Sequence, residues 1–327
     1  MSTLLWALNS KCNFHCKYCY LDFDKDKNPI NNRNTVGIQK ISDKKIFKFI
    51  GELKRYNINR VFLAGAEPLL DIISILSIIK AIKKEGIQVV LCTNGYLIEK
   101  YYKEIIVSHL DAISISLDSY NKKYNNTYRG YPTNDGFEKV INGIKIIKEK
   151  SKIKVGVYSV LTKKNLEDLE KTYKFVSNLY CDYFIYQPVF LNENSKLYKE
   201  LVIDKKDINK FKIIIEKLYN IKSNTLLPNK EYSNKIIQSI LRKEKCIKEC
   251  FAGRDLFFIT PDGSIHACPS SKKIPYEKEK IKIDELNLEK VFLEKKLAVS
   301  ECYDFSEDCV NMWQLMAFNE ILYKVKI

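Results

Sequence analysis

The chain has no apolar stretch of the roughly 20 residues that a membrane-spanning helix needs. The nearest one, Ile72 to Ile82, is short and is followed by Lys83-Lys84. The first residues also lack the basic segment, the long apolar segment and the small-residue cleavage site of a secretory signal. We therefore expect a cytoplasmic protein without membrane association, whose ten cysteines are not paired as disulfides.

Charge of one sign is in excess, but no segment concentrates it. The 327 residues carry a formal net charge of +15, spread mainly as single lysines among isoleucine, asparagine and tyrosine. A nucleic-acid-binding protein usually gathers its basic residues on one face or stripe, so we do not expect a nucleic-acid partner. A diffuse basic surface does attract acidic partners at low salt, such as an acidic peptide or a reduced flavoprotein that donates electrons.

Three of the cysteines, Cys12, Cys16 and Cys19, lie in one short segment directly after the strand-like stretch Leu4 to Leu8. A cubane iron-sulfur cluster has four irons, so three thiolates leave one iron open to a small molecule. A structural zinc site also uses closely spaced cysteines, but it needs a fourth ligand. His15, between two of the cysteines, is badly placed to close a tetrahedron. The spacing therefore favours a cluster, with zinc as the open alternative.

This C-x3-C-x2-C pattern, with Tyr18 just before the last cysteine, resembles the signature of the radical S-adenosylmethionine (SAM) superfamily. The resemblance implies a 4Fe-4S cluster on Cys12, Cys16 and Cys19, whose open iron chelates SAM, with Tyr18 beside the cofactor. It implies an oxidoreductase that cleaves SAM reductively to methionine and a 5′-deoxyadenosyl radical, which removes a hydrogen atom from a substrate. Such an enzyme needs an electron donor such as flavodoxin or ferredoxin.

Six β-rich runs alternate with helical patterns as far as about Phe190, which predicts an α/β fold with a parallel sheet. The expected strands are Leu4–Leu8, Val61–Ala64, Val89–Cys92, Ile113–Leu117, Val155–Val160 and Tyr183–Tyr186. The expected helices are Lys44–Tyr56, Ile72–Lys84, Ile98–Val107, Phe137–Lys148 and Leu166–Leu179. Six right-handed repeats form an incompletely closed barrel, and the resemblance implies this same partial (β/α)6 TIM-like barrel. We expect the barrel over residues 1–200, a helical connector over 201–245 and a small cysteine-rich domain over 246–327.

Function in β/α barrels is concentrated in the loops that follow the strands. Gly65-Ala66-Glu67-Pro68 follows the second expected strand and resembles the Gly-Gly-Glu-Pro motif of the superfamily, which implies that Gly65, Ala66 and Glu67 hold the amino group of SAM. An acid and a proline before an apolar periodic stretch also begin ordinary helices, but the position after the second strand favours the motif. Ala66 replaces a glycine, so the backbone must deviate there if that glycine needs a positive φ.

Polar residues also follow the third and fourth expected strands. A period of two places Ser114, Ser116 and Asp118 on one face of the fourth strand and the apolar residues between them on the other. The resemblance implies that Asn94 and Ser116 contact the ribose or the carboxylate of SAM. It also implies that Arg129 pairs with a carboxylate of SAM or of the substrate, the alternative being a solvated arginine.

A second group of cysteines lies near the C-terminus. Pro261-Asp262-Gly263 predicts a hairpin turn, and the pattern around it resembles the opening half of the SPASM or twitch extension of radical SAM enzymes. The five cysteines of this region are too few for two clusters, so the resemblance implies one auxiliary 4Fe-4S cluster, ligated by Cys250, Cys268, Cys302 and Cys309, with Cys246 as a spare or alternative ligand. A four-cysteine zinc site stays open. Cys92 and Cys181 stand alone in apolar strands, which predicts that both are core residues.

These motifs do not define the substrate, and three hypotheses remain. The first is a peptide or protein, as in relatives that mature ribosomally made peptides or oxidise a sulfatase residue. Because the first strand is expected near residue 4, a separate leader-recognition protein is then a possible partner. The second is a small molecule, as in aminocyclitol dehydrogenases or in cyclases of the molybdopterin-precursor type, although the chain ends in Lys326-Ile327 and not in Gly-Gly. The third, from another class, is a non-catalytic zinc or cluster protein that serves as a binding scaffold.

Overall fold

The computed structural model describes residues 2–19, 41–191, 193–241, 247–248, 251–269, 281–285, 288–298, 301–302, 320–321 and 323–324, of which 247–248 and 301–302 are described as backbone only. The strands are β1 (Ser2–Ala7), β2 (Ile58–Ala64), β3 (Gln88–Thr93), β4 (Ala112–Ser116), β5 (Lys154–Leu161), β6 (Tyr183–Pro188), β7 (Ile247–Lys248), β8 (Leu256–Ile259), β9 (Ser264–His266), β10 (Ile281–Lys282) and β11 (Glu301–Cys302). The α-helices are α1 (Asp43–Glu52), α2 (Ile72–Lys84), α3 (Ile98–Val107), α4 (Lys122–Arg129), α5 (Gly136–Lys150), α6 (Leu169–Asn178), α7 (Tyr198–Leu201), α8 (Ile208–Tyr219), α9 (Lys230–Leu241) and α10 (Leu288–Phe292). Short 3-10 helices are η2 (Pro68–Asp71), η3 (Leu166–Asp168) and η4 (Lys205–Asp207).

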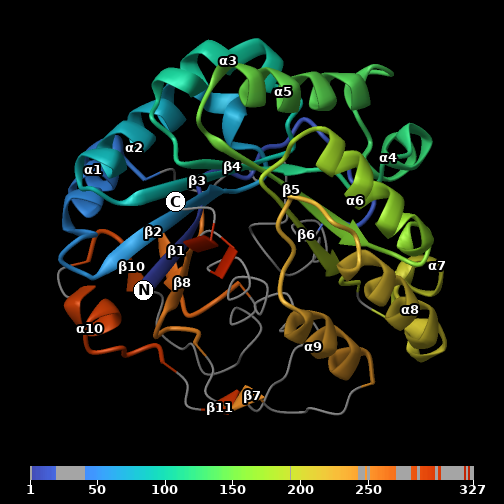
Figure 1. Ribbon diagram of the computed structural model, residues 1–327. Helices are drawn as coiled ribbons and strands as arrows, with labels where there is room; N and C mark the ends of the chain where they lie inside the picture. The colour runs from blue at the N-terminus through green and yellow to red at the C-terminus, as the bar shows by residue number, and fades with distance from the viewer. Residues whose placement is uncertain are drawn as a thin grey trace.

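Six parallel strands, β1 to β6, form the centre of the fold in chain order, each paired with the next. Helices α1 to α6 lie outside this sheet, along its curved outer face (Figure 1). The six strands and the helices expected from the sequence are all present, with ends that differ by a few residues. The expectation of an α/β fold whose parallel sheet curves as in a partial β/α barrel is therefore confirmed.

The sheet does not end at β1. Strand β8 pairs in parallel with β1 and antiparallel with β9, and β10 adds a further antiparallel strand. The hairpin expected around Pro261 is thus formed, and it extends the barrel sheet to nine strands. The sequence does not predict the β1–β8 pairing, because its two partners lie at opposite ends of the chain. The sheet runs past residue 246, so the division into a barrel and a C-terminal domain stays a prediction.

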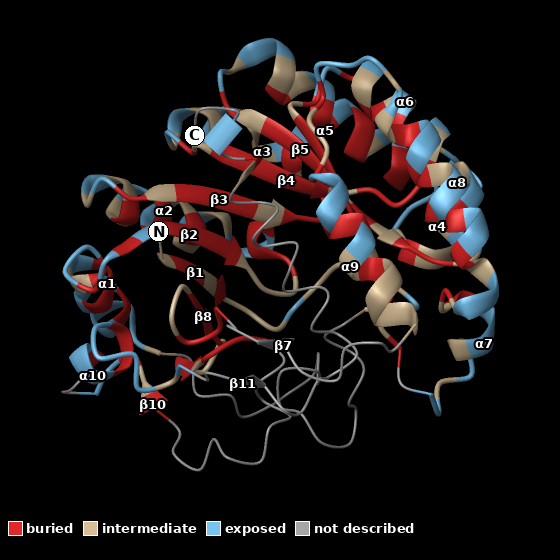
Figure 2. Ribbon diagram, turned by 60° about the horizontal axis from the view of Figure 1, so that its bottom comes forward, coloured by how far each residue is buried: buried red, intermediate tan, exposed pale blue. Residues whose placement is uncertain are grey.

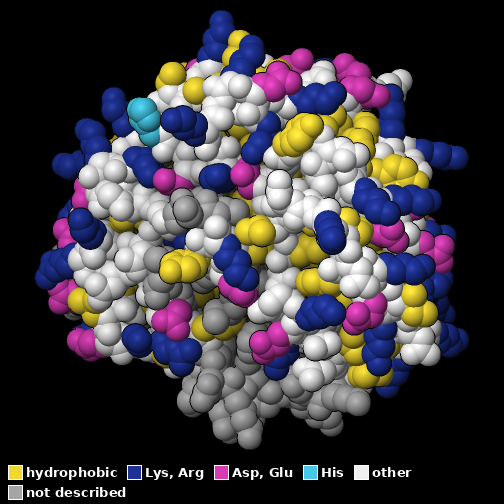
Figure 3. Space-filling view, viewed as in Figure 1, with side chains coloured by type: hydrophobic (Ala, Val, Ile, Leu, Met, Phe, Trp, Pro, Cys, Tyr) yellow, Lys and Arg dark blue, Asp and Glu magenta, His cyan; other side chains and the backbone are white. Residues whose placement is uncertain are grey.

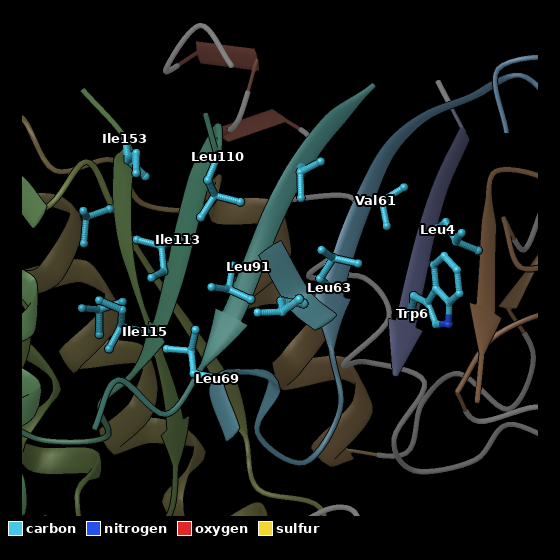
Figure 4. Close-up of a cluster of buried hydrophobic side chains, with 14 of the residues drawn as sticks. Leu4, Trp6, Val61, Leu63, Leu69, Leu91, Leu110, Ile113, Ile115 and Ile153 are labelled. Atoms are coloured by element: carbon cyan, nitrogen blue, oxygen red, sulfur yellow. The ribbon is translucent and has the colours of Figure 1, made fainter. Parts of the chain in front are cut away.

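The parallel strands consist mostly of buried residues (Figure 2). Two sets of side chains fill the space around them. Alternate residues such as Leu63, Leu91 and Ile113 point outward and pack under the helices (Figure 4). The residues between them, such as Phe62 and Val90, point to the inside of the barrel and belong to a second buried cluster there. Apolar side chains on both faces are what a parallel sheet covered by helices requires, although buried polar residues such as Arg60 and Ser114 also lie inside the barrel.

The surface agrees with the diffuse charge of the sequence. In the face seen in Figure 3, lysine and arginine side chains are scattered among acidic ones and form no single stripe. Within the described part of the chain, no helix has the length and the apolar character needed to cross a membrane.

Candidate functional site

A cavity of about 360 Å³ lies at the carboxyl ends of the parallel strands, a volume within the roughly 300–1,000 Å³ of small-ligand sites. Its lining residues are Cys12, Phe14, Cys16, Tyr18, Cys19, Ala64, Gly65, Ala66, Cys92, Thr93, Asn94, Ser116, Arg129, Tyr158, Val160, Gln187, Pro188, Val189 and Phe190. The three N-terminal cysteines and all the expected cofactor-binding residues except Glu67 are in this set. Residues far apart in the sequence therefore meet at the edge of the sheet where the motifs place them.

The segment that carries the three cysteines, residues 12–19, is held against the end of helix α4. The backbone N–H groups of His15 and Lys17 donate to the carbonyl oxygens of Gly130 at 3.2 Å and Tyr128 at 2.8 Å. Helix α4 ends because Gly130 adopts the left-handed conformation, with φ +59°. A β-carbon at Gly130 would lie 2.7 Å from the carbonyl oxygen of His15, so only glycine lets the cysteine segment approach this closely.

The thiols of Cys12, Cys16 and Cys19 are partly buried, and none of them is in a disulfide. Desolvation raises the pKa of Cys16 to about 12, despite the opposing effect of the Arg129 guanidinium. This thiol therefore keeps its proton at neutral pH unless a metal takes the place of the proton. Within the described residues, no three His, Cys, Asp or Glu side chains are grouped so as to hold one metal ion, whereas the three thiols share one cavity. His15 is exposed and does not line the cavity, which removes it as the fourth ligand of a zinc ion.

Glu67 lies beneath the cavity and does not line it. Its side chain is fully buried, and its Oε1 accepts hydrogen bonds from the Thr93 hydroxyl at 2.7 Å and the Leu69 N–H at 3.0 Å. Its Oε2 accepts one from the Asn94 N–H at 2.7 Å. Burial raises the pKa of Glu67, and these hydrogen bonds oppose the rise. In this structure Glu67 joins the loop after β2 to the loop after β3, and its contact with SAM stays a prediction.

The backbone at Ala66 does not show the deviation that was expected if the glycine of the motif needs a positive φ. The non-glycine residues with positive φ among the described ones do not include Ala66, whereas Gly65 has φ +134°. A β-carbon on Gly65 would lie 2.9 Å from the carbonyl oxygen of Asn9. The first residue of the motif, and not the second, is therefore the one that this backbone restricts to glycine.

Asn94 and Ser116 occupy different parts of the cavity wall. Asn94 Nδ2 donates to Asn13 Oδ1 at 2.7 Å and lies 3.8 Å from the Cys12 sulfur, so this side chain contacts the cysteine segment. Ser116, the last residue of β4, lines the cavity on the interior face of the strand. Ser114 lies on the same face deeper in the barrel, where its hydroxyl is 2.9 Å from that of Tyr183. The two-residue alternation expected for β4 is confirmed.

Asp118 is a buried carboxylate that joins two of the expected cofactor-binding residues. The sequence placed it only on the polar face of the fourth expected strand. Its Oδ2 accepts hydrogen bonds from the Tyr18 hydroxyl at 2.5 Å and from Arg129 Nη1 at 2.8 Å. Arg129 is 6% exposed, so it is not a solvated surface arginine. Its Nε is buried and has no hydrogen-bond partner among the described residues. The sequence feature that distinguishes Asp118 is its place after Ser114 and Ser116 in the two-residue polar pattern, just beyond the end of β4.

The structure corrects the expectation for Cys92. Cys181 is 3% exposed and belongs to the core, as expected, but Cys92 lines the cavity. Cys92 comes near the carboxyl end of β3, and its side chain faces the interior where the barrel opens into the cavity.

Elsewhere on the cavity wall, the Tyr158 hydroxyl of β5 donates to Gln187 Oε1 of β6 at 2.7 Å. The sequence reasoning assigned no role to Gln187.

The expected ligands of an auxiliary cluster are mostly not described. Cys250, Cys309 and the alternative ligand Cys246 lie outside the described residues, and Cys302 is described only as backbone, in β11. Cys268 follows β9 and is 7% exposed, packed in the apolar cluster of the barrel interior. The auxiliary ligand set therefore stays a prediction.

The residues around the cavity fit a cluster with a bound amino acid derivative. Three thiols that are in no disulfide line one cavity, which suits a group of several irons better than a single ion. The unpartnered Nε of Arg129 offers a buried cationic donor, the group that a carboxylate prefers. Gly65, whose backbone approaches Asn9 too closely for a β-carbon, also lines the cavity, beside Ala66.

Comparison with known proteins agrees with this geometry. The model of the radical SAM superfamily matches residues 7–176, and the chain belongs to this superfamily. It is therefore a radical SAM enzyme whose cofactors are SAM and the superfamily's 4Fe-4S cluster. The expectation drawn from the cysteine spacing is confirmed, and a zinc scaffold is no longer favoured.

Two relatives of this chain have names that state different activities. A Saccharolobus islandicus protein named "Probable GTP 3′,8-cyclase" is 27% identical over 174 residues, which are 53% of this chain and 52% of the relative. The chain thus spans about half of the length of such relatives. A Methanocaldococcus jannaschii protein, named as a glycyl-radical enzyme activating enzyme, is 28% identical over 243 residues, 72% of this chain and 87% of the relative.

Solved structures show the same fold over most of the chain. The enzyme anSMEcpe with bound AdoMet matches with a TM-score of 0.67 and 20% identity, covering 89% of this chain and 80% of that one. Streptococcus suis SuiB bound to S-adenosylmethionine matches with a TM-score of 0.64 and 17% identity, covering 89% and 63%. At these identities the likeness establishes the fold.

Proposed function

We propose that this radical SAM enzyme acts on a peptide or protein. The observation that carries the proposal is the composition of the cavity wall. Among the described lining residues, Arg129 is the one charged side chain, and its charge is balanced by Asp118 at 2.8 Å. The rest of the cavity wall is formed by uncharged groups such as Tyr158, Gln187 and Phe190. Amide and aromatic side chains of this kind suit the amides and side chains of a peptide.

The structural neighbours support a peptide substrate. SuiB has been solved bound to the precursor peptide SuiA, and anSMEcpe with AdoMet and the Cp18Cys peptide. The net charge of +15 suits an acidic leader peptide, which a separate recognition protein would present if the enzyme has no such domain. An electron donor such as flavodoxin or ferredoxin completes the set of proposed partners.

When bound, the cluster and SAM would supply hydrogen-atom abstraction from the substrate, and the electron that this chemistry consumes would come from the separate electron donor. The chain's own residues supply the binding. Cys12, Cys16 and Cys19 would hold iron, and Arg129 would offer its Nε to the carboxylate of SAM. Asn94 and Ser116 line the wall that would face the ribose, and the backbone at Gly65 and Ala66 would receive the amino group. The apolar lining and the buried position keep water away from the radical.

We further propose an auxiliary 4Fe-4S cluster in a twitch-like C-terminal region, with the ligands Cys250, Cys268, Cys302 and Cys309. Such a cluster would accept an electron from the substrate or bind the substrate directly. Iron analysis after anaerobic reconstitution tests the number of clusters. About eight irons per chain are expected for two 4Fe-4S clusters, and about four would contradict the auxiliary cluster.

The second candidate function is nucleotide cyclisation, which the match to the named GTP 3′,8-cyclases favours. A triphosphate is normally held by several cationic groups or by Mg²⁺, and the described wall of the cavity provides one guanidinium that is already paired. A small-molecule dehydrogenase has no specific observation in its favour.

The test uses the reconstituted enzyme with dithionite and SAM under anaerobic conditions. The wild type is expected to release 5′-deoxyadenosine, and the Cys16→Ala variant is not. Release is then measured with GTP and with short peptides encoded next to the gene. Stimulation by a peptide, with a mass change in that peptide, supports the proposal. Stimulation by GTP with formation of a cyclised nucleotide would replace it with the second candidate.

A further inference from the structure

The Asp118 side chain accepts three hydrogen bonds beside the cavity, although it does not line the cavity itself. It comes two residues after the end of β4 and is 1% exposed. Besides Tyr18 and Arg129 on Oδ2, it accepts the N–H of Val160, in β5, on Oδ1 at 2.8 Å. One carboxylate thus connects the cysteine segment, the end of α4 and the end of β5.

The backbone of Asp118 is held as firmly as its side chain. Its N–H donates to Asn125 Oδ1 at 3.2 Å, and its carbonyl oxygen accepts from Asn165 Nδ2 at 2.8 Å and from the Ser159 hydroxyl at 3.2 Å. Both ends of the residue are therefore fixed by neighbouring elements. Because the backbone of Asp118 is fixed, its carboxylate has little freedom to move. The hydrogen bonds to it therefore restrict its partners to one geometry.

The first partner, Tyr18, lies inside the cysteine segment between Cys16 and Cys19. Its ring is 6% exposed, and the hydroxyl contact with Asp118 anchors the second half of that segment to the barrel. The backbone contacts of His15 and Lys17 anchor the first half. The Tyr18 ring also stacks on Tyr128 and packs in a cluster with Val189 and Leu191, so the hydroxyl contact with Asp118 is the polar part of this anchor.

The second partner, Arg129, is oriented from two sides. Its Nη1 donates to Asp118, and its guanidinium lies over the Phe14 ring at 5.8 Å from the ring centre. A guanidinium is planar, so fixing one nitrogen and one face also fixes the direction of Nε. That Nε is the buried donor without a partner, in a side chain that lines the cavity.

We propose that Asp118 is a positioning residue that couples the two halves of the cofactor site. Through Tyr18 it keeps the cysteine segment in the shape that accepts iron, and through Arg129 it directs a buried donor at an anionic group of the ligand, such as a carboxylate. Burying a charged pair is costly and is often no gain in stability, so an organising role accounts for a pair in this place. The proposal concerns the radical SAM site and is independent of the substrate.

The test compares Asp118→Asn with two variants that each remove one arm, Tyr18→Phe and Arg129→Lys. Two quantities are measured on anaerobically reconstituted protein: the iron retained per chain without SAM, and the SAM dissociation constant from the change that SAM causes in the electron paramagnetic resonance spectrum of the reduced cluster. Tyr18→Phe is expected to lower iron retention and Arg129→Lys to weaken SAM binding, each effect of the order of tenfold for a lost hydrogen bond to a charged group. Asp118→Asn should cause both losses.

The matched control is Asp111→Asn. Asp111 precedes the other end of β4 and accepts from Lys83 Nζ and the Val89 N–H, both at 2.7 Å, far from the cavity. This variant should change neither quantity. If Asp118→Asn changes only one of them, or resembles Asp111→Asn, the proposal is overturned.

Should Asp118→Asn fail to fold, the double variant Tyr18→Phe/Arg129→Lys carries the test. It removes both Oδ2 contacts while Asp118 stays in place. It must show both losses, and wild-type iron retention or wild-type SAM affinity in this protein would overturn the proposal.

Discussion

The carboxylate of Glu67 and the backbone of Asn94 join two loops of the active site at a distance of 2.7 Å. Asn94 in turn donates from its side chain to Asn13, in the cysteine segment. A single buried acid therefore fixes the loop after β3, which then contacts the cysteine segment. The described donors to this acid are not cations: they are the hydroxyl of Thr93 and the backbone N–H groups of Leu69 and Asn94.

The first prediction is that Glu67 gives the stability of the protein a characteristic dependence on pH. Burial raises its pKa above the ordinary value of 4.5. A raised pKa means a contribution that is complete below pH 4.5 and is lost as the pH rises through the pKa of the folded state. Glu67→Gln has no such loss. The difference in unfolding free energy, variant minus wild type, should therefore become more positive as the pH rises.

Urea unfolding between pH 4.5 and 8 measures this difference. Glu104→Gln, on the exposed side of α3, is the matched control and should give a flat difference. A difference that is flat or falls with pH for Glu67→Gln would contradict the raised pKa.

The second prediction concerns the two adjacent residues of the loop after β2. Gly65→Ala forces alanine into φ +134° and brings its β-carbon to 2.9 Å from the Asn9 carbonyl oxygen. A backbone conformation of this type costs of the order of 1–3 kcal/mol. Ala66→Gly relieves no strain, and it should lower stability by about 0.4–1 kcal/mol through the added freedom of the unfolded chain. A stabilised Ala66→Gly protein would mean that Ala66 is strained.

The third prediction concerns the contact between Gly130 and the cysteine segment. Gly130→Ala places a β-carbon 2.7 Å from the His15 carbonyl oxygen and also pays about 1–2 kcal/mol for the left-handed conformation. The variant should lose stability, and it should retain less iron after reconstitution because the segment must move. Gly51→Ala is the control: it lies in α1, its β-carbon would meet nothing within 4 Å, and alanine there should be neutral or gain up to about 1 kcal/mol. Equal behaviour of the two variants would argue against the contact.

The sequence was a good guide to the barrel because its signals are local. Each strand of the barrel is a short β-rich run and each helix has an apolar period, so both can be read within one segment. The β1–β8 pairing has no such signal. It depends on the fit of Leu4 and Leu5 against Phe257 and Phe258, residues that become neighbours only after the barrel has formed.

The same limit applies to the site. The motifs predicted that Cys12, Asn94 and Arg129 lie together, because strand ends in a barrel converge. They did not predict that the Glu67 side chain is buried and does not line the cavity. Its position depends on which hydrogen-bond donors surround it in the folded chain. They assigned no role to Asp118, whose partner Tyr18 is 100 positions away, and they placed Cys92 in the core because the opening of the barrel is a property of the folded chain.

The last prediction concerns the hairpin that extends the sheet beyond β1. Asp262, in the turn, accepts hydrogen bonds from the Thr260 hydroxyl, and from the hydroxyl and the N–H of Ser264 at 2.9 and 3.3 Å. Burial by itself raises the pKa of Asp262, but these hydrogen bonds outweigh it, and the pKa lies below the ordinary value of 3.8. The contribution of Asp262 to stability is therefore present above pH 3.8 and is lost as the pH falls through the pKa of the folded state.

Asp262→Asn should destabilise the protein by about 0.5–1.5 kcal/mol at neutral pH, the usual worth of a hydrogen bond. This penalty should shrink as the pH falls below the ordinary value, because the wild-type carboxylate is then protonated as well. The sign is opposite to that expected at Glu67, so the two variants measured side by side control for general effects of acid. A penalty at Asp262 that stays constant down to pH 3 would mean that the ionised carboxylate is not what holds the turn, and that the hairpin is positioned by its pairing with β1 alone.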